Sequence, residues 1–348
     1  MVRKLTACAL AVSSFMLAGQ VLAAGTFTMK IGAEFRSEYE YHNNGLAEPN
    51  EDATSTINLN ALKVKLYGNV GDNTTFNFLI DATTSTAAGL VEYAYLTHSI
   101  NDMFAIRIGK NYLNYGGFER KRQDYKAIYL SPAVTGGLGP MANYHVLSAP
   151  AIEGHLSFGD AGKVVVQVAT DAPYGRSSHT PVGANDNTDL KQPSVYVEYT
   201  GNFSGVKVLG QYGISDYGNA TNYGVGLGVD MQGVSATLDW NQEIVSTSSK
   251  DDQTAMNTVL HVSYNAGAFT PWFTFNMWEM DQEPTDAEDN TPGLFDDNLM
   301  GWAVGVTCSD SSKAFHPYAA FGMNQGDFAS GVKGESEMFV KVGVTSEF

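Results

Sequence analysis

Apolar and polar residues alternate with a period of two along this chain, from about residue 26 to the last residue, and no other feature limits the possible folds as strongly. In the closing stretch EMFVKVGVTSEF, Met338, the three valines within 340–344 and Phe348 share one phase, and Glu337 and Lys341 share the other. This alternation predicts a β-strand with one apolar and one polar face. A chain terminus is usually frayed and solvated, so a final apolar aromatic residue needs a pairing partner and an apolar neighbour.

The same alternation predicts an all-β fold of about sixteen strands, with no helical pattern of useful length between them. One hairpin divided wrongly changes the count by two, so fourteen and eighteen strands remain open. We expect the strands near residues 26–41, 56–70, 74–83, 91–99, 103–111, 144–158, 163–171, 193–200, 206–213, 221–230, 234–245, 254–264, 268–278, 298–308, 313–324 and 337–348.

The connections between these segments alternate in length. Tight turns rich in Gly, Asn and Asp follow the even-numbered strands, whereas longer and more polar loops follow most odd-numbered strands. Short turns at one rim and long loops at the other are typical of a transmembrane antiparallel β-barrel. The last strand then pairs with the first, which closes the barrel and leaves no exposed edge.

Aromatic residues on the apolar phase recur next to the predicted short turns. Scattered surface aromatics would not keep phase with turn position. We expect them to form a girdle at the inner membrane interface, where aromatic rings prefer to lie. The predicted girdle consists of Phe76, Phe104, Phe158, Tyr199, Tyr264, Phe269, Phe315 and Phe348.

The first residues have the three-part form of a secretory signal peptide. MVRK supplies positive charge, LTACALAVSSFMLAG is an apolar run, and QVLAA ends with small residues. We expect cleavage after Ala23, with cleavage after Ala24 as the alternative. The segment 1–23 would then be removed, and 24–348 would form a single barrel domain.

Composition excludes several classes of protein. Cys8 lies in the signal segment and leaves Cys308 alone, so no intramolecular disulfide is expected. A net charge of −17 argues against nucleic acid as a partner, because phosphates demand basic surfaces. The segment 24–348 contains no run of the ~20 apolar residues that a membrane helix requires. No cofactor and no metal site is predicted.

With its alternating strands, its turn pattern and its C-terminal aromatic residue, the chain resembles the Gram-negative outer-membrane porins, in particular the sixteen-stranded trimeric general porins. The likeness is one of pattern along 24–348. It implies a homotrimer in outer-membrane lipid and lipopolysaccharide, and recognition of Phe348 by the barrel-assembly machinery. It also implies a water-filled channel for passive diffusion of ions and small hydrophilic solutes, rather than an enzyme.

One predicted connection, 112–143, is unusually long and rich in aromatic residues, and loops of this length are usually functional. In the family that the chain resembles, the loop at this position folds into the barrel and narrows the pore. The sequence YGGFE at 115–119 departs from the family, whose glycine pair follows a Pro-Glu-Phe motif. The segment 119–126 also carries a net charge of about +2 where general porins are acidic. A loop packed over the rim or against a neighbouring subunit is the alternative.

The polar phase of each strand is expected to line the lumen, and Lys63, Lys65 and Arg107 are the strongest candidates for the constriction. Charges on this phase are nearly balanced, so no strong ion selectivity is predicted, although the basic residues favour anions such as phosphate in an alternative reading. The acids on this phase include Glu34, Asp81, Glu92, Glu198, Asp239 and Glu243, and Lys207 is a further base. The predicted constriction residues are Lys30, Arg36, Lys63, Lys65, Arg107 and Lys341 on the wall, and Glu119, Lys121, Arg122 and Asp124 in the loop.

Rival functions receive less support. The pair His261 and Ser263 has the spacing of an outer-membrane phospholipase, but the predicted register turns it toward the lumen, where a lipid substrate would not reach it. The acidic stretch 279–297 lacks calcium-loop spacing and is read as a solvated loop, with weak divalent bridging to lipopolysaccharide as the alternative. A structural or adhesive barrel without an open pore remains open. A soluble β-sandwich would leave Phe348 unexplained.

Overall fold

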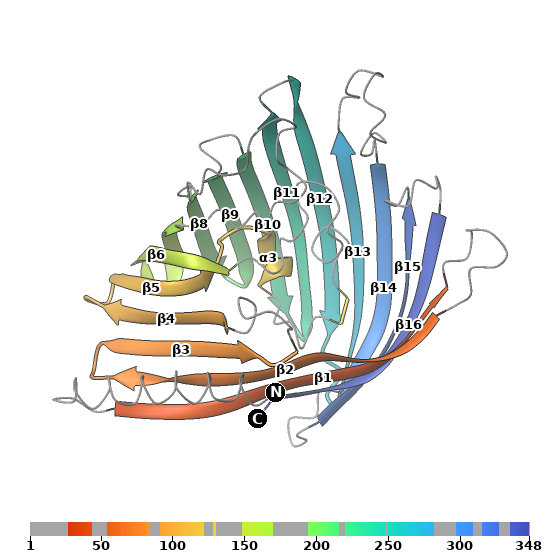
Figure 1. Ribbon diagram of the computed structural model, residues 1–348, viewed down its shortest axis with the longest axis horizontal. Helices are drawn as coiled ribbons and strands as arrows, with labels where there is room; N and C mark the ends of the chain where they lie inside the picture. Colours follow the sequence, from red (N-terminus) through yellow and green to blue (C-terminus); the bar gives the residue numbers. More distant parts are fainter. Residues whose placement is uncertain are drawn as a thin grey trace, which may run out of the picture.

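The computed structural model describes residues 27–43, 54–83, 91–121, 128–129, 148–169, 194–215, 220–247, 250–281, 297–308, 315–326 and 335–347. Within these residues, sixteen antiparallel strands form one closed barrel in which β1 pairs with both β2 and β16 (Figure 1). The predicted all-β barrel and its strand count are confirmed. Predicted strand boundaries lie within four residues of the observed ones. The strands are β1 (Phe27–Asn43), β2 (Thr54–Val70), β3 (Thr74–Asp81), β4 (Val91–Ser99), β5 (Phe104–Tyr112), β6 (Ser148–Ser157), β7 (Lys163–Ala169), β8 (Ser194–Phe203), β9 (Val206–Ser215), β10 (Ala220–Met231), β11 (Val234–Thr247), β12 (Lys250–Tyr264), β13 (Phe269–Asp281), β14 (Asp297–Cys308), β15 (Phe315–Gly326) and β16 (Glu335–Glu347), and the helical turns are α3 (Gly117–Arg120) and η2 (Gly159–Ala161).

Two of the short turns show how the chain reverses. Ser204–Gly205 connects β8 to β9 and Gln232–Gly233 connects β10 to β11. All four residues have positive φ, at 53° and 90° in the first turn and 51° and 84° in the second. Two consecutive left-handed residues match the twist of a hairpin, and glycine adopts this conformation without a Cβ penalty. These turns therefore fix the register of both hairpins.

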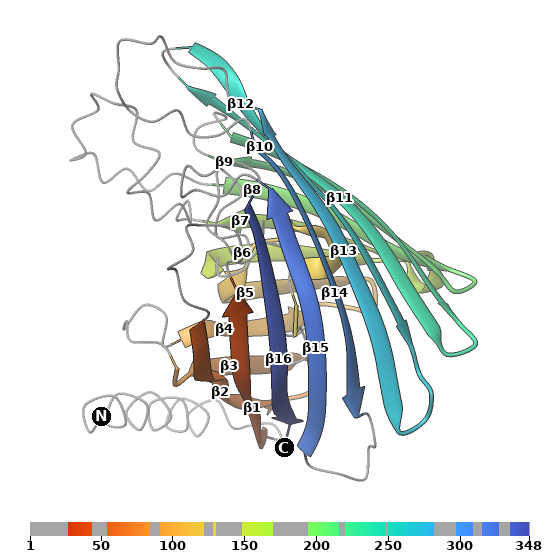
Figure 2. The same ribbon diagram turned by 90° about the vertical axis from the view of Figure 1, so that its right-hand side faces the viewer.

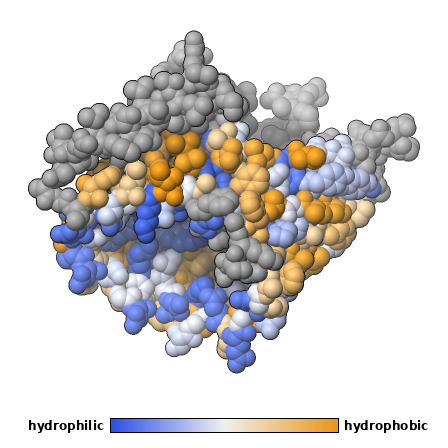
Figure 3. All heavy atoms as spheres, turned by 90° about the horizontal axis from the view of Figure 1, so that it is seen from below, coloured by the Kyte–Doolittle hydropathy of each residue, from blue (hydrophilic) through white to orange (hydrophobic). Residues whose placement is uncertain are grey.

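Side chains alternate between the outer and inner faces of the wall along every strand. On β11, Leu238 and Trp240 point outward and are exposed, while Asp239 and Asn241 point inward and are buried. The exposed large hydrophobic residues of the described strands all share the outward phase. Figure 3 shows a recess with hydrophilic walls and hydrophobic residues gathered on the outer surface beside it. An apolar outer face and a polar inner face are what a membrane barrel requires.

Among the described residues, no helix is long and apolar enough to cross a membrane.

The wall is uneven in strand length. The strands from β3 to β7 have seven to ten residues, whereas β1 and β2 have seventeen each and β12 has fifteen. In Figure 2, β13–β16 run along the side nearest the viewer, and the shorter strands lie behind them. The long connection after β5 therefore leaves from the shorter side of the barrel.

Polar side chains on the inner face join the first and last strands. Lys341 on β16 lies 2.6 Å from Glu40 on β1, and the two ring nitrogens of His42 lie 2.8 Å from Glu40 and 2.6 Å from Glu337. The Tyr318 hydroxyl on β15 donates to Glu38. Ion pairs and hydrogen bonds thus reinforce the backbone pairing that closes the barrel.

The described members of the predicted aromatic girdle lie on the outward phase, next to short turns. Phe158, Tyr264, Phe269 and Phe315 are exposed, and Phe104 and Tyr199 are half-buried. Phe348 lies outside the described residues. A role at the lipid interface stays a prediction for this set.

Phe76 departs from the rest of the girdle. It is only 2% exposed, because its ring stacks on that of Phe27 with 5.8 Å between centroids and lies over Gly68. Periodicity alone could not predict this burial, since it depends on a neighbouring strand that offers glycine beneath the ring.

Candidate functional site in the barrel lumen

The chain turns into the lumen directly after β5. The short helix α3 packs against β9, β10 and β11, on the far side of the barrel from β1 (Figure 1). The residues before it run close to β7, where the Asn114 backbone N–H donates to the Gln167 side chain at 3.0 Å. The segment from Leu113 to Lys121 therefore crosses part of the lumen rather than extending over the rim.

Buried side chains of the wall hold this segment by its backbone. The Gly117 N–H donates to Gln211 Oε1 at 2.9 Å, and the N–H groups of Phe118 and Glu119 donate to the two carboxylate oxygens of Asp239, both at 2.8 Å. Asp239 has no exposed surface. These amides are the ones that a helical turn leaves without internal partners, so the wall caps α3.

Glycines on both sides allow this close approach. Gly116 and Gly117 have φ values of 92° and 71°, which side chains rarely adopt. A Cβ on Gly226 of β10 would lie 2.7 Å from the Phe118 ring and 2.7 Å from Asp239. The glycines of YGGFE and Gly226 therefore allow α3 to pack closely against the wall. We call the wall residues that α3 contacts, Gln211, Gly226 and Asp239, the seat of α3.

Ile128 and Tyr129 contact a different part of the wall. Ile128 packs with Tyr318 and Trp272, and Tyr129 packs with Phe339, their rings stacked at 5.4 Å between centroids. The Tyr129 hydroxyl lies 2.7 Å from Asn276 Oδ1 and 2.8 Å from Asn324 Oδ1. Burial raises the pKa of the Tyr129 phenol, so it stays neutral and able to donate. The predicted inward segment thus touches two separate arcs of the barrel, β7–β11 and β13–β16. Its residues 122–127 and 130–143 lie outside the described part of the chain.

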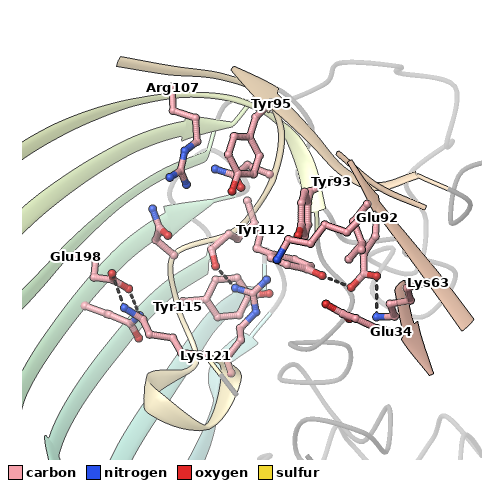
Figure 4. A pocket seen from close by; sticks show the side chains of 17 residues that line it. Glu34, Lys63, Glu92, Tyr93, Tyr95, Arg107, Tyr112, Tyr115, Lys121 and Glu198 are labelled. Carbon is pink, nitrogen blue, oxygen red and sulfur yellow. Dashed lines mark hydrogen bonds and ion pairs between the residues drawn. The ribbon is translucent and has the colours of Figure 1, made fainter. Parts of the chain in front are cut away.

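Between the inward segment and the arc β1–β5 lies a cavity of about 280 Å³. Five cations and three carboxylates line it, together with four tyrosines (Figure 4). Its lining residues are Glu34, Lys63, Lys65, Leu79, Glu92, Tyr93, Tyr95, Arg107, Asn111, Tyr112, Leu113, Asn114, Tyr115, Arg120, Lys121, Glu198 and Gln211.

Two of the carboxylates are held in ion pairs across this cavity. Lys63 lies 2.7 Å from Glu92, which also accepts a hydrogen bond from the Tyr112 hydroxyl (Figure 4). Lys121 of the inward segment lies 2.6 Å from Glu198, which also accepts from Gln211 at 2.7 Å. The second pair joins the inward segment to β8.

Arg107 bridges an acid and an aromatic ring. Its guanidinium lies 4.3 Å from the centre of the Tyr95 ring and 3.3 Å from Glu153, and its Nε donates to Thr97 at 3.1 Å. Glu153 is buried and accepts further hydrogen bonds from Asn111 and Gln167. The acid is thus satisfied behind the arginine, while the tyrosine covers one face of the guanidinium.

Two further cations of the cavity, Arg120 and Lys65, also lie against rings. The Arg120 guanidinium is 5.1 Å from the Tyr112 ring centre and 5.5 Å from that of Tyr115, and it donates to the Leu113 carbonyl. Burial raises the pKa of the Tyr115 phenol well above its usual value. Lys65 lies 5.7 Å from the Tyr67 ring centre. Such cation–π contacts hold cations in place without neutralising them.

The structure brings together four of the predicted constriction residues, Lys63, Lys65, Arg107 and Lys121, at this cavity. Lys30, Arg36 and Lys341 lie on the inner face but do not line the cavity. Arg122 and Asp124 lie outside the described residues.

Glu119 requires a correction. Its side chain has no exposed surface and does not line the cavity, because its backbone is bound to Asp239 in the seat of α3. Its charge alone predicts a pore-lining position, but the helical turn places its side chain on the buried side.

The sequence reading missed the tyrosines of the cavity. Tyr93 and Tyr95 lie on the polar phase of VEYAYLTHS, where ring residues are unexpected if the lumen is merely solvated. Two aromatic residues two positions apart on a lumen phase could have identified this part of the wall. Tyr112 and Tyr115 flank the point where the chain leaves the strand, which periodicity does not describe.

The remaining candidates for chemistry are a metal site, Cys308 and His261. Among the described residues, no group of three or more His, Cys, Asp or Glu side chains could hold a metal ion. Cys308 is a buried free thiol on the outward phase. His261 faces the lumen, as the register predicted, where it bonds Thr274 at 2.8 Å and stacks on Trp272.

No protein-family model matches the sequence, and a search of curated proteins finds no match. Solved outer-membrane barrels are nevertheless similar in structure. OmpT of Vibrio cholerae, an outer membrane protein in its trimer form, has a TM-score of 0.62 at 13% identity, covering 93% of this chain and 100% of that chain. OmpF of Salmonella typhi scores 0.61 at 14% identity, covering 92% and 97%. The outer membrane channel DcaP of Acinetobacter baumannii scores 0.59 at 11% identity, covering 92% and 98%. The chain therefore has the fold of the outer-membrane porin barrels.

Proposed function

We propose that this protein is an outer-membrane porin, which lets ions and small hydrophilic solutes diffuse passively through a water-filled lumen. One observation carries the proposal. The closed barrel is apolar outside and polar inside, and the segment Leu113–Lys121 narrows its lumen but leaves a cavity lined by charged side chains. A barrel of sixteen strands is wide enough for an aqueous channel.

The mechanism is diffusion without turnover. The barrel sets an upper limit on solute size, and the inward segment reduces it between α3 and the arc β1–β5. Ion pairs such as Lys63–Glu92 and Lys121–Glu198 fix the shape of the passage, because the first links β2 to β4 and the second links the inward segment to β8. The remaining charges bias which ions pass.

The same proposal includes the export, the assembly and the membrane environment of the protein. The chain would be exported by its N-terminal segment 1–23, assembled through Phe348, and embedded among outer-membrane lipid and lipopolysaccharide. The trimer form of Vibrio cholerae OmpT, which has a similar fold, supports a homotrimer. Cross-linking of the protein in native outer membranes would test this assembly.

A second candidate, preference for anions, rests on the charges of the cavity. Five cations and three carboxylates line it, and two of those carboxylates are already paired. Chloride would then pass more readily than potassium.

Single-channel recording in planar bilayers tests both statements. Purified, heat-modifiable protein should open in steps, and the reversal potential under a KCl gradient should have the sign of anion preference. Correctly folded protein that never opens would overturn the porin proposal and favour a structural or adhesive barrel. A cation-selective potential would overturn the second candidate alone.

A further inference from the structure

We propose that the cavity beside the inward segment favours small planar aromatic anions, a single ring carrying a carboxylate, over aliphatic anions of the same charge and over neutral sugars. This inference rests on the proposed function, since it names the solute class for which the narrow part of the channel is shaped. Both components of the preference, positive charge and aromatic surface, come from described residues.

The charge component lies in Lys65 and Arg107. Among the described residues, no carboxylate lies within ion-pair distance of Lys65, whose ammonium rests against the Tyr67 ring. Arg107 pairs with Glu153 through one terminal nitrogen and donates to Thr97 through Nε, and a guanidinium carries five N–H donors, so donors remain for a solute. The planar fork of a guanidinium binds a carboxylate edge-on, and the ring of Tyr95 holds that plane in place.

The aromatic component is a cluster of tyrosines beside these cations. Tyr93 lies 5.4 Å from Tyr95 and 5.6 Å from Tyr112 between ring centroids, at interplanar angles of 36° and 73°. Edge-to-face and offset arrangements of this kind are the favourable ones for aromatic rings. A further flat ring entering the cavity would extend the cluster with the same geometry. The cavity volume of about 280 Å³ leaves room for one ring and a few waters.

Neutral sugars fit the same surfaces less well. A sugar would stack on tyrosine, but its hydroxyls also require carboxylates or amides with spare hydrogen-bonding capacity. At this cavity Glu92 is bound to Lys63 and Tyr112. Glu198 is bound to Lys121 and Gln211. Two of the three acids are thus committed to holding the wall and the inward segment, and the third, Glu34, is buried. The balance of recognition therefore falls to the cations and the rings.

The experiment measures permeability ratios from reversal potentials, with chloride on one side of the bilayer and benzoate or cyclohexanecarboxylate on the other. The two probes share charge and carbon number, and only benzoate is planar and aromatic. We expect benzoate to permeate about threefold to tenfold better, as one additional aromatic contact would give. Maltose, a neutral sugar, should not compete with benzoate at equal concentration.

Variants separate charge from ring. Tyr93→Leu should bring the ratio of the two probes close to one, because it removes a ring and keeps a side chain of similar apolar size. Lys65→Gln should lower the permeability of both probes alike. Lys207→Gln removes a lumen-facing cation on β9 that does not line the cavity, and it should change neither. Because Lys65 lies outside the tyrosine cluster, its variant remains informative if Tyr93→Leu fails to fold.

The possible failures are distinguishable. Equal permeability of benzoate and cyclohexanecarboxylate through a channel of normal conductance would overturn this inference and leave the porin proposal standing. Block by maltose below the concentration at which benzoate acts would do the same and would favour a sugar site. Folded protein without conductance would overturn the proposed function itself.

Discussion

The lumen of this barrel has two polar walls that differ in what they bind. The arc β7–β11 presents Gln167, Gln211 and Asp239, and all of them are bonded to the backbone of the inward segment. The arc β1–β5 presents Lys63, Lys65 and Arg107 to an open cavity. Both sets lie on the polar phase of their strands, so the phase determines which face a residue shares but not what that residue does.

The difference lies in what faces each wall. On β10, lumen-facing Gly226 leaves room for a second layer of chain, and Phe118 of α3 occupies it. On β4, the corresponding inward positions include Tyr93 and Tyr95, whose rings fill that space themselves. Glycine on the wall therefore lets a chain segment pack against it, whereas tyrosines on the wall keep the segment at a distance and leave a cavity.

Loss of the seat of α3 should produce the largest change. Asp239→Ala removes the acceptor of two buried N–H groups, each worth about 1.5–3 kcal/mol to a charged partner. We expect a higher single-channel conductance with noisy open levels, measured in planar bilayers, because the inward segment is released. Asp230→Asn, at the exposed end of the same lumen face, is the matched control and should leave conductance unchanged. Wild-type conductance in Asp239→Ala would show that the seat is not needed to hold the segment.

Crowding the seat should have the next largest effect. A Cβ at Gly226 would lie 2.7 Å from both Phe118 and Asp239, so Gly226→Ala must displace α3. Conductance and the exclusion limit for poly(ethylene glycol) should both change. Gly210→Ala on the adjacent strand points outward, with no atom within 4 Å of the new methyl group, and should behave as wild type. Identical size exclusion in both variants would contradict the close packing of α3.

Much of the fold was predictable from the sequence because a barrel wall depends on local, repeated information. Alternation fixes the face of each residue, and turn residues fix the reversals, so the register of Lys63, Lys65 and Arg107 toward the lumen follows directly. The seat of α3 was not predictable in this way. It requires Asp239 to meet amides 120 residues earlier in the chain, and no local pattern encodes that contact.

In the candidate site, too, some residues were predictable from strand alternation and others were not. The wall cations of the cavity follow from strand phase, whereas the burial of Glu119 and the position of Tyr115 depend on how the inward segment packs. The glycine pair at 116–117 differs in order from that of the family that the sequence resembles, and its role became clear only with Gly226 and Asp239 opposite it. In chain segments that leave the barrel wall, the position of each side chain depends on tertiary contacts and not on a local sequence pattern.

Reversing charge on the open wall should have an intermediate effect that leaves the seat intact. Lys63→Glu with Lys65→Glu converts two cations of the cavity into acids beside Glu92. Under a tenfold KCl gradient, where ideal selectivity gives ~59 mV, the reversal potential should shift toward cations by on the order of 10 mV. Lys30→Glu with Lys207→Glu makes the same charge change at two lumen-facing positions that do not line the cavity, and should shift the reversal potential less. Equal shifts would mean that overall lumen charge, and not this arc, sets the preference.

The smallest effect should come from the second contact of the inward segment. Tyr129→Phe keeps the ring stacked on Phe339 and removes only the hydroxyl that lies between Asn276 and Asn324. The two buried amides would lose a shared partner, at a cost of about 1–3 kcal/mol. This is less than the loss at Asp239, because the amides are neutral and the ring contact remains. We expect wild-type mean conductance with more frequent brief closures, counted in single-channel records. Tyr223→Phe, on the outer face, is the control. Tyr129→Phe could instead change conductance as much as Asp239→Ala. The inward segment would then be held equally by both of its contacts. The difference between the wall that binds α3 and the wall that lines the cavity would no longer explain how the lumen is divided.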